Sequence, residues 1–131
     1  MPEKVYTTPR IDKLGIRPGA RVVLVGVTDK EFERELHERT DAVVSDATEA
    51  ADVVVYRADS PADLARLREM RGWIKPNGAV WVLRRKGKGA PVGELELMRA
   101  GQEAGMVDNK IASFSDELSA MRFVIRLRDR E

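Results

Sequence analysis

The sequence predicts a three-layer α/β sandwich with a mostly parallel sheet, and three observations lead to this fold class. Residues 21–27 form an almost uninterrupted β-branched run, which is typical of strands that helices cover on both faces. Segments with strand and helix patterns then alternate along the chain, and residues 60–74 carry the strongest helix signal. Finally, only five residues separate the last two predicted strands, too few for a helical crossover, so the chain should end in an antiparallel hairpin.

Length and composition predict one globular domain over residues 1–131, with residues 1–20 as a lead-in segment. The 23 Lys and Arg are offset by 22 Asp and Glu, a balance that argues against nucleic acid as a partner. There is no cysteine and one histidine, His37, so thiolate catalysis is excluded and a metal site is not expected. No apolar run is long enough to cross a bilayer, and we expect a cytoplasmic protein without a membrane partner.

The first strand should lead directly into a short amphipathic helix over residues 29–38. Thr28 and Glu31 have the spacing of a capping box, and Phe32 and Leu36 lie four positions apart on one helical face. This pattern predicts a helix that packs one side against the sheet.

Two strands are predicted next, over residues 42–45 and 52–56. The six residues between them, 46–51, fall short of the dozen or more that a parallel crossover normally needs. We therefore expect the second strand to be short and to lie at the edge of the sheet.

The helix over residues 60–74 begins with Ser60 as N-cap and Pro61 in the first turn. Its apolar face is formed by Leu64, Leu67, Met70 and Ile74. Residues 75–78 should end this helix, and residues 79–83 form the next apolar strand.

A last helix is predicted over residues 93–104, with Gly105 in the position that favours a left-handed cap. Strands over residues 107–114 and 120–128 follow, and the second alternates apolar and basic residues as a half-buried strand does. The order β-α-β-β-α-β-α-β-β is that of a Rossmann-like sandwich with an antiparallel C-terminal hairpin.

After Asp52 the chain resembles the second half of class I methyltransferases. An acidic residue opens the strand 52–55, residues 74–78 read Ile-Lys-Pro-Asn-Gly where those enzymes have Leu/Ile-Lys-Pro-Gly-Gly, and Ala-Gly-Met at 104–106 replaces their Ala-Gly-Phe. The resemblance implies a truncated methyltransferase fold.

Most of the chain is also similar to a family of short bacterial proteins, the domain of unknown function 3052 family. This resemblance rests on residues 13–19, on the strand at 22–27, on residues 104–108 and on the ending 119–124. It implies the same fold and carries no activity or catalytic residue.

The turn after the first strand holds the first candidate ligand residues, Gly26, Thr28 and Asp29. Nucleotide and S-adenosylmethionine sites need several glycines here so that backbone can approach the ligand, and only Gly26 is present. We therefore predict no cofactor and no catalytic residue. Asp46 lies twenty positions after Gly26, a spacing suited to a ribose hydroxyl, but a turn-forming Asp in a polar loop is the favoured explanation because the glycine motif is absent.

The loop 84–89 supplies a second group of candidates, Arg84, Arg85, Lys86 and Lys88. It follows a parallel strand and so lies at the carboxyl edge of the sheet, as does Arg57 after the third strand. These cations could hold a phosphate or an acidic partner surface, or they could form a solvated loop.

Three functions remain open at this point. The first is a non-catalytic, methyltransferase-like module that binds a partner protein or a small anionic ligand at this edge. The second is an enzyme that uses S-adenosylmethionine or a nucleotide through a variant loop. The third is a self-associating domain, possible as a homodimer, in which the final strand from Met121 to Leu127 forms the interface.

Overall fold

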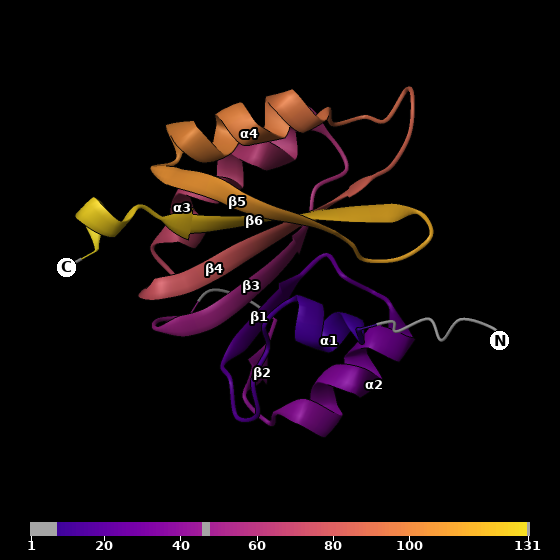
Figure 1. The fold of residues 1–131 in the computed structure, drawn as a ribbon, viewed down its shortest axis with the longest axis vertical. Helices are drawn as coiled ribbons and strands as arrows, with labels where there is room; N and C mark the ends of the chain where they lie inside the picture. The colour runs from indigo at the N-terminus through magenta and orange to yellow at the C-terminus, as the bar shows by residue number, and fades with distance from the viewer. Residues whose placement is uncertain (1–7, 46–47, 131) are drawn as a thin grey trace, which may run out of the picture.

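The computed structural model describes residues 8–45 and 48–130, and they form three layers. Helices α1 (Arg10–Lys13) and α2 (Lys30–Arg39) cover one face of a single sheet. The other face carries the 3-10 helix η1 (Pro61–Arg66), α3 (Leu67–Arg71) and α4 (Glu94–Glu103), as Figure 1 shows. The predicted α/β sandwich is therefore confirmed.

The sheet has six strands in the order β2-β1-β3-β4-β6-β5. Their bounds are β1 Val22–Val25, β2 Val43–Val44, β3 Ala51–Arg57, β4 Ile74–Arg85, β5 Met106–Ser113 and β6 Leu118–Ile125. The first four strands are parallel, whereas β6 is antiparallel to both β4 and β5. The mostly parallel sheet and its antiparallel C-terminal hairpin are as predicted.

The position of β6 contradicts the interface expected of the final strand. β6 lies between β4 and β5, so its backbone is paired on both sides, and β5 is the edge strand instead. The strand also ends at Ile125, and Leu127 lies in the 3-10 helix η2 (Leu127–Asp129) with 78% of its surface exposed. Self-association through a free β6 edge is therefore wrong.

The short link before β3 is possible because β2 has only two residues. Val43 and Val53 both pair with Val22, from opposite sides of β1, and the side chain of Arg21, just before β1, donates to the Glu49 carbonyl at 3.1 Å. Ala51 lies two strand spacings away from Val44 and three residues nearer the amino ends of the strands. The straight distance between the two residues is therefore roughly 14 Å. The seven peptide units between these residues span about 24 Å when extended, so the link is long enough to reach β3. A longer β2 would leave too few residues for the link.

The helical segment after Ser60 is shorter than predicted. Ser60 and Pro61 do begin it, and the Asp63 carboxylate accepts a hydrogen bond from the Ser60 N–H at 3.1 Å. However, helix ends at Arg71, and Ile74 already belongs to β4, where it pairs with Ala51.

Residues 75–78, expected as a terminator, are part of β4 because Gly78 allows close approach to β3. A Cβ atom at Gly78 would lie 2.9 Å from the Ala51 carbonyl oxygen. The register of the β3–β4 pair shifts between Ala51 and Val53, at the same place. Glycine therefore continues the strand here instead of ending a helix.

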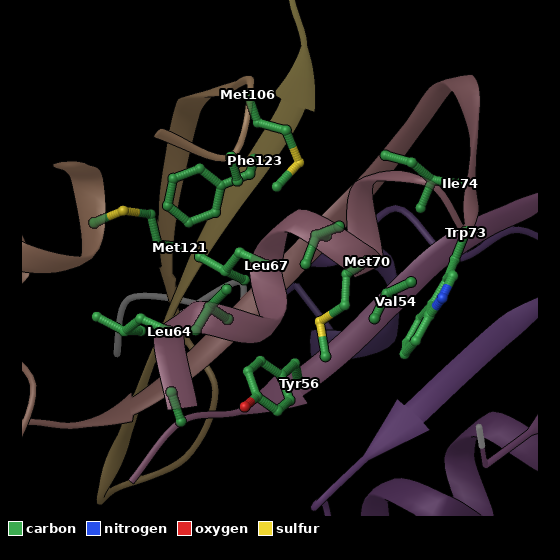
Figure 2. Packing of buried hydrophobic residues seen from close by; sticks show 14 of the residues in the cluster. Val54, Tyr56, Leu64, Leu67, Met70, Trp73, Ile74, Met106, Met121 and Phe123 are labelled. Carbon is green, nitrogen blue, oxygen red and sulfur yellow. The ribbon is translucent and has the colours of Figure 1, made fainter. Parts of the chain in front are cut away.

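The core consists of two clusters, one on each face of the sheet. Along β3, Val54 and Tyr56 point to the α3–α4 side, whereas Val53 and Val55 point to the α1–α2 side. Figure 2 shows the first cluster, in which Phe123 and Met70 lie among side chains from both helices and strands. Trp73 and Trp81 are buried, one in each cluster, as predicted for core aromatics. Within the described ranges, no helix combines the length and apolar character needed to span a bilayer.

Candidate functional site

The carboxyl ends of β1 and β3 bring four of the predicted site residues together. Val25 pairs with Tyr56, so Gly26, the first residue after β1, lies level with Arg57, the last residue of β3. Gly26 has φ +74°, a left-handed conformation in which glycine is favoured, and a Cβ there would lie 3.7 Å from the Arg57 Cβ. Thr28 and Asp29 follow in the same turn.

Two hollows lie beside this turn, and Thr28 lines both. The larger, of about 610 Å³, is bounded by Gly26, Ser45 and the exposed His37. The smaller, of about 210 Å³, lies between Asp29, Arg57 and the tip of the β5–β6 hairpin. Asp46, expected to face a ribose at this edge, lies outside the described residues, although its neighbour Ser45 lines the larger hollow.

Asp29 is the N-cap of α2, which corrects the assignment of Thr28 as the capping residue. The Phe32 N–H donates to the Asp29 carboxylate at 2.9 Å, and the helix begins at Lys30. Burial acts to raise the pKa of Asp29, but the hydrogen bond from Phe32 and the charge of Arg10 outweigh it and hold the pKa below its usual value. The start of α2 is therefore occupied by a carboxylate of the chain itself.

Arg10 locks this carboxylate in place from the lead-in segment. Its guanidinium lies 3.1 Å from Asp29 and 3.1 Å from Glu35, and it also donates to the Phe114 carbonyl at 3.1 Å. The same group lies over the rings of Phe32 and Phe114, which contact each other edge to face at 4.9 Å. Arg10 thereby joins α1, α2 and the hairpin into one unit.

The sequence reasoning missed Arg10. The residue stands in a charged lead-in without periodicity, and its partners Asp29, Glu35 and Phe114 are distant in the chain. Only the folded arrangement brings them together, so no spacing pattern could have identified this cluster.

Arg57, at the end of β3, forms an ion pair with Asp59, two positions later in the chain. Its Nε donates to the Asp59 carboxylate at 2.8 Å, and its side chain is 33% exposed. Arg57 therefore contributes a compensated charge to the smaller hollow.

Residues 84–89, predicted as a loop, begin within β4, because Arg84 pairs with Ser119 and Arg85 with Leu118 in β6. The cations of this basic loop do not gather around one point. Arg84 bonds to the Val92 carbonyl at 3.3 Å and approaches Glu94 at 3.4 Å, beside α4. Lys86 instead reaches the β5–β6 hairpin, where its Nζ donates to the Ser113 hydroxyl at 2.8 Å and to the Ser115 carbonyl at 2.7 Å.

Arg85 and Lys88 complete the loop and are exposed. Neither charged side-chain group has a hydrogen-bond or ion-pair partner among residues 8–45 and 48–130, although the Arg85 carbonyl accepts a hydrogen bond from Arg84 at 3.4 Å. The loop is thus anchored at Arg84 and Lys86 and presents two positive charges outward.

The chemistry available at this edge is charge recognition. Carboxylates and cations lie at the ends of parallel strands, where open α/β sheets bind ligands. Among the described residues, no cluster of three His, Cys, Asp or Glu side chains is arranged to hold a metal ion.

Solved structures with a similar fold include methyltransferases. A SAM-dependent methyltransferase from Aquifex aeolicus matches 89% of this chain and 88% of its own, with 13% identity and a TM-score of 0.69. A TehB-like SAM-dependent methyltransferase from Corynebacterium glutamicum matches 89% and 86%, with 11% identity and a TM-score of 0.60. In a complex between the Haloferax volcanii Trm112 methyltransferase activator and a putative methyltransferase, the matched chain gives 11% identity and a TM-score of 0.67, over 88% of this chain and 86% of that one.

Identities this low establish the fold and nothing more. A comparison with curated protein sequences finds no significant match. A family model described as protein of unknown function (DUF3052) matches residues 11–127. The chain therefore belongs to the DUF3052 family and has a methyltransferase-like Rossmann fold.

Proposed function

We propose that this protein is a binding module without catalytic activity, which uses the carboxyl edge of its methyltransferase-like sheet to hold an acidic segment of a partner protein. The site comprises the turn with Gly26, Thr28 and Asp29, the side chain of Arg57, and the basic loop 84–89. Arg85 and Lys88 would contact the partner directly, whereas Arg84 and Lys86 would hold the loop in place.

The observation that carries this proposal is the ion-pair cluster at the start of α2. In Rossmann-type sites the first helix directs its N–H groups at a phosphate or another anionic group of the ligand. Here the Asp29 carboxylate takes the Phe32 N–H, and Arg10 neutralises that carboxylate at 3.1 Å. A cofactor in the usual position would have to displace a charge that is already paired, which favours a role other than cofactor chemistry.

The shape of the basic loop favours a partner surface over a small anion. A phosphate clamp needs cations that converge within hydrogen-bond reach of one group. Arg84 is held toward α4 and Lys86 toward the hairpin, while Arg85 and Lys88 are exposed. An extended acidic segment could contact both exposed charges at once.

The Haloferax volcanii neighbour is a methyltransferase-like chain found in complex with an activator protein. That complex supports the idea that this fold can present a surface to another protein. The present proposal rests on the charges of this chain, because the identity between the two proteins is 11%.

The test is a calorimetric titration at low ionic strength with a short poly-glutamate peptide, inorganic pyrophosphate and S-adenosylmethionine. The peptide should bind and weaken as salt is added. The double variant Arg85→Gln/Lys88→Gln should lose about tenfold in affinity, since two exposed ion pairs are worth roughly 1–2 kcal/mol together.

The matched control is Arg68→Gln/Arg99→Gln, which removes the same charge from exposed positions on α3 and α4. This variant should bind the peptide as the parent protein does. Equal weakening in both variants would reduce the effect to net charge and contradict the proposal. Saturable binding of S-adenosylmethionine, lost in Gly26→Val, would replace it with the enzyme alternative.

A further inference from the structure

A hollow of about 620 Å³ opens at the other end of the sheet, beside the amino ends of β3 and β4. The loop that follows α1 forms one wall, from Leu14 to Ala20. Asp52, Asn77 and Arg122 of the sheet form the other. Its volume is within the range of small-molecule sites, roughly 300–1,000 Å³.

The charge of this hollow is positive. Arg17 is exposed and has no side-chain partner in the described part of the chain. Arg122 is half-buried, and its guanidinium donates a hydrogen bond to the neutral Asn109 amide oxygen at 3.2 Å. Neither arginine has a carboxylate within ion-pair distance among residues 8–45 and 48–130.

The acidic residue that lines the hollow does not offset these charges. Asp52 already pairs with Lys75 at 2.8 Å and accepts the Arg21 N–H at 2.9 Å. Burial acts to raise the pKa of Asp52, but these contacts outweigh it and keep the pKa low. The carboxylate is therefore ionised, and the charge of Lys75 offsets it.

The Arg122 guanidinium has no negatively charged partner among the described residues. Burial lowers the pKa of its guanidinium, and the nearby Arg130 lowers it further. A partly desolvated guanidinium with one neutral acceptor is costly, and an oxyanion with two acceptor oxygens would match its fork of N–H donors.

The loop wall is held in place before any ligand arrives. The Trp81 indole N–H donates to the Leu14 carbonyl at 3.0 Å, and Arg39 donates to the Ile16 carbonyl at 2.7 Å. The Gly19 N–H in turn donates to the Arg39 carbonyl at 3.2 Å. A wall fixed at three points needs little ordering on binding, which favours affinity for a small ligand.

We propose that this hollow is a second site, which binds a small molecule bearing a phosphate or carboxylate group between Arg17 and Arg122. It lies at the opposite end of the sheet from the basic loop, so it goes beyond the partner-binding role and stands independently of it. It also involves the segments 13–19 and 119–124, which the carboxyl-edge site leaves without a role.

The test is a nitrogen-15 NMR titration of the whole chain with inorganic pyrophosphate and, separately, with citrate. Saturable shifts are expected at the Gly19 and Asn77 amides and at the Arg122 Nε–H. Arg122→Gln should weaken binding about tenfold, because hydrogen bonds to charged groups are among the stronger ones. Arg17→Gln, a change in an exposed loop residue that does not endanger folding, should weaken it as well.

Arg99→Gln on α4 is the control and should leave the titration unchanged. Response to pyrophosphate alone identifies a phosphate ligand, response to citrate alone a carboxylate ligand, and response to both the shared oxyanion chemistry. The proposal is overturned if neither probe saturates, or if Arg17→Gln and Arg122→Gln bind as the parent does. A failure of poly-glutamate binding at the basic loop would leave these outcomes untouched.

Discussion

Gly101 lies on the buried side of α4, directly against the ring of Phe123. A Cβ atom built at Gly101 would overlap that ring, and the ring is fully buried and cannot swing away. The glycine is therefore required by packing, although alanine has the higher helix propensity.

Gly101→Ala should lower the free energy of unfolding by about 1–3 kcal/mol, since overpacking outweighs the gain in propensity. Urea denaturation measures this change. Gly93→Ala, at a position where an added Cβ meets no atom within 4 Å, serves as the control and should change stability much less. Equal stability of Gly101→Ala and the parent would contradict the packing described for α4.

Tyr56 should make the protein sensitive to alkaline pH. Burial, supported by the charge of Asp63, raises the pKa of its phenol from 10.0 to about 12. Its O–H donates to the Asp63 carbonyl at 2.7 Å. Below pH 10 the phenol is protonated in both states and its stabilisation is complete. Between pH 10 and about 12 the unfolded chain ionises first, so the free energy of unfolding falls by up to about 2 kcal/mol.

Urea denaturation at several pH values, compared between the parent and Tyr56→Phe, isolates this contribution. The variant should be about 1 kcal/mol less stable at neutral pH, because it loses one hydrogen bond. Because phenylalanine does not ionise, the gap between the two proteins should close above pH 10 and change sign as the pH approaches about 12. A constant gap through that range would mean that Tyr56 ionises as it does in the unfolded chain.

At the scale of elements, α2 depends on one carboxylate with two tasks. Asp29 caps the helix and pairs with Arg10, and substitutions can separate these tasks. Asp29→Ala should cost about 1–2 kcal/mol, since it removes both the cap and the ion pair. Asp29→Asn keeps a capping oxygen and should cost less than the alanine change.

The acid dependence gives a second check on the same residue. The pKa of Asp29 is lowered in the folded state, so its stabilisation is complete above its ordinary value of 3.8 and is lost as pH falls through the folded-state pKa. The stability gap between the parent and Asp29→Asn should therefore shrink at low pH. Thermal unfolding followed by circular dichroism from pH 7 to 3 measures it, and a gap that grows on acidification would contradict the ion pair.

The elements with strong apolar patterns could be predicted from the sequence, and those set by long-range contacts could not. The β-branched run before Gly26 and the left-handed Gly105, which has φ +89°, depend on local preferences. The start of β4 at Ile74 depends on pairing with Ala51, and local signals there favour a turn. Local sequence signals therefore predict the end of a helix at the place where pairing with β3 begins the strand β4.

The candidate site divides in the same way. Gly26, Thr28, Asp29 and Arg57 were predicted to share the carboxyl edge, because strand order alone determines it, and they do. Arg10 was not predicted, since its contacts come from three separate elements. The divergence of Arg84 and Lys86 is likewise a property of the folded chain.

At the scale of the whole molecule, the sheet has one long exposed edge, β5. Lys110 and Ile111 are both exposed there, and the register of β5 against β6 shifts between Asp108 and Lys110. A bulge and a lysine are features that discourage edge-to-edge pairing between molecules.

Lys110→Val should therefore promote concentration-dependent association, because it removes the charge from the exposed edge strand and replaces it with a β-branched apolar residue. Sedimentation velocity over a concentration series measures this effect. Lys30→Val, at an exposed position at the start of α2, is the control away from the edge. Association that is equal in the two variants would assign the effect to general hydrophobicity instead of to β5.

The two tryptophans lie on opposite faces of the sheet, Trp73 in the α3–α4 cluster and Trp81 in the α1–α2 cluster. Each layer therefore carries its own fluorescent reporter. In Trp81→Phe the remaining emission follows the α3–α4 layer, and in Trp73→Phe it follows the layer that Arg10 joins together. Coincident denaturation curves for the two proteins would mean that both layers melt as one cooperative unit. An earlier transition of the Trp81 emission would mean that the layer of α1 and α2 unfolds first. That face of the sheet would then be exposed while the rest of the protein stays folded.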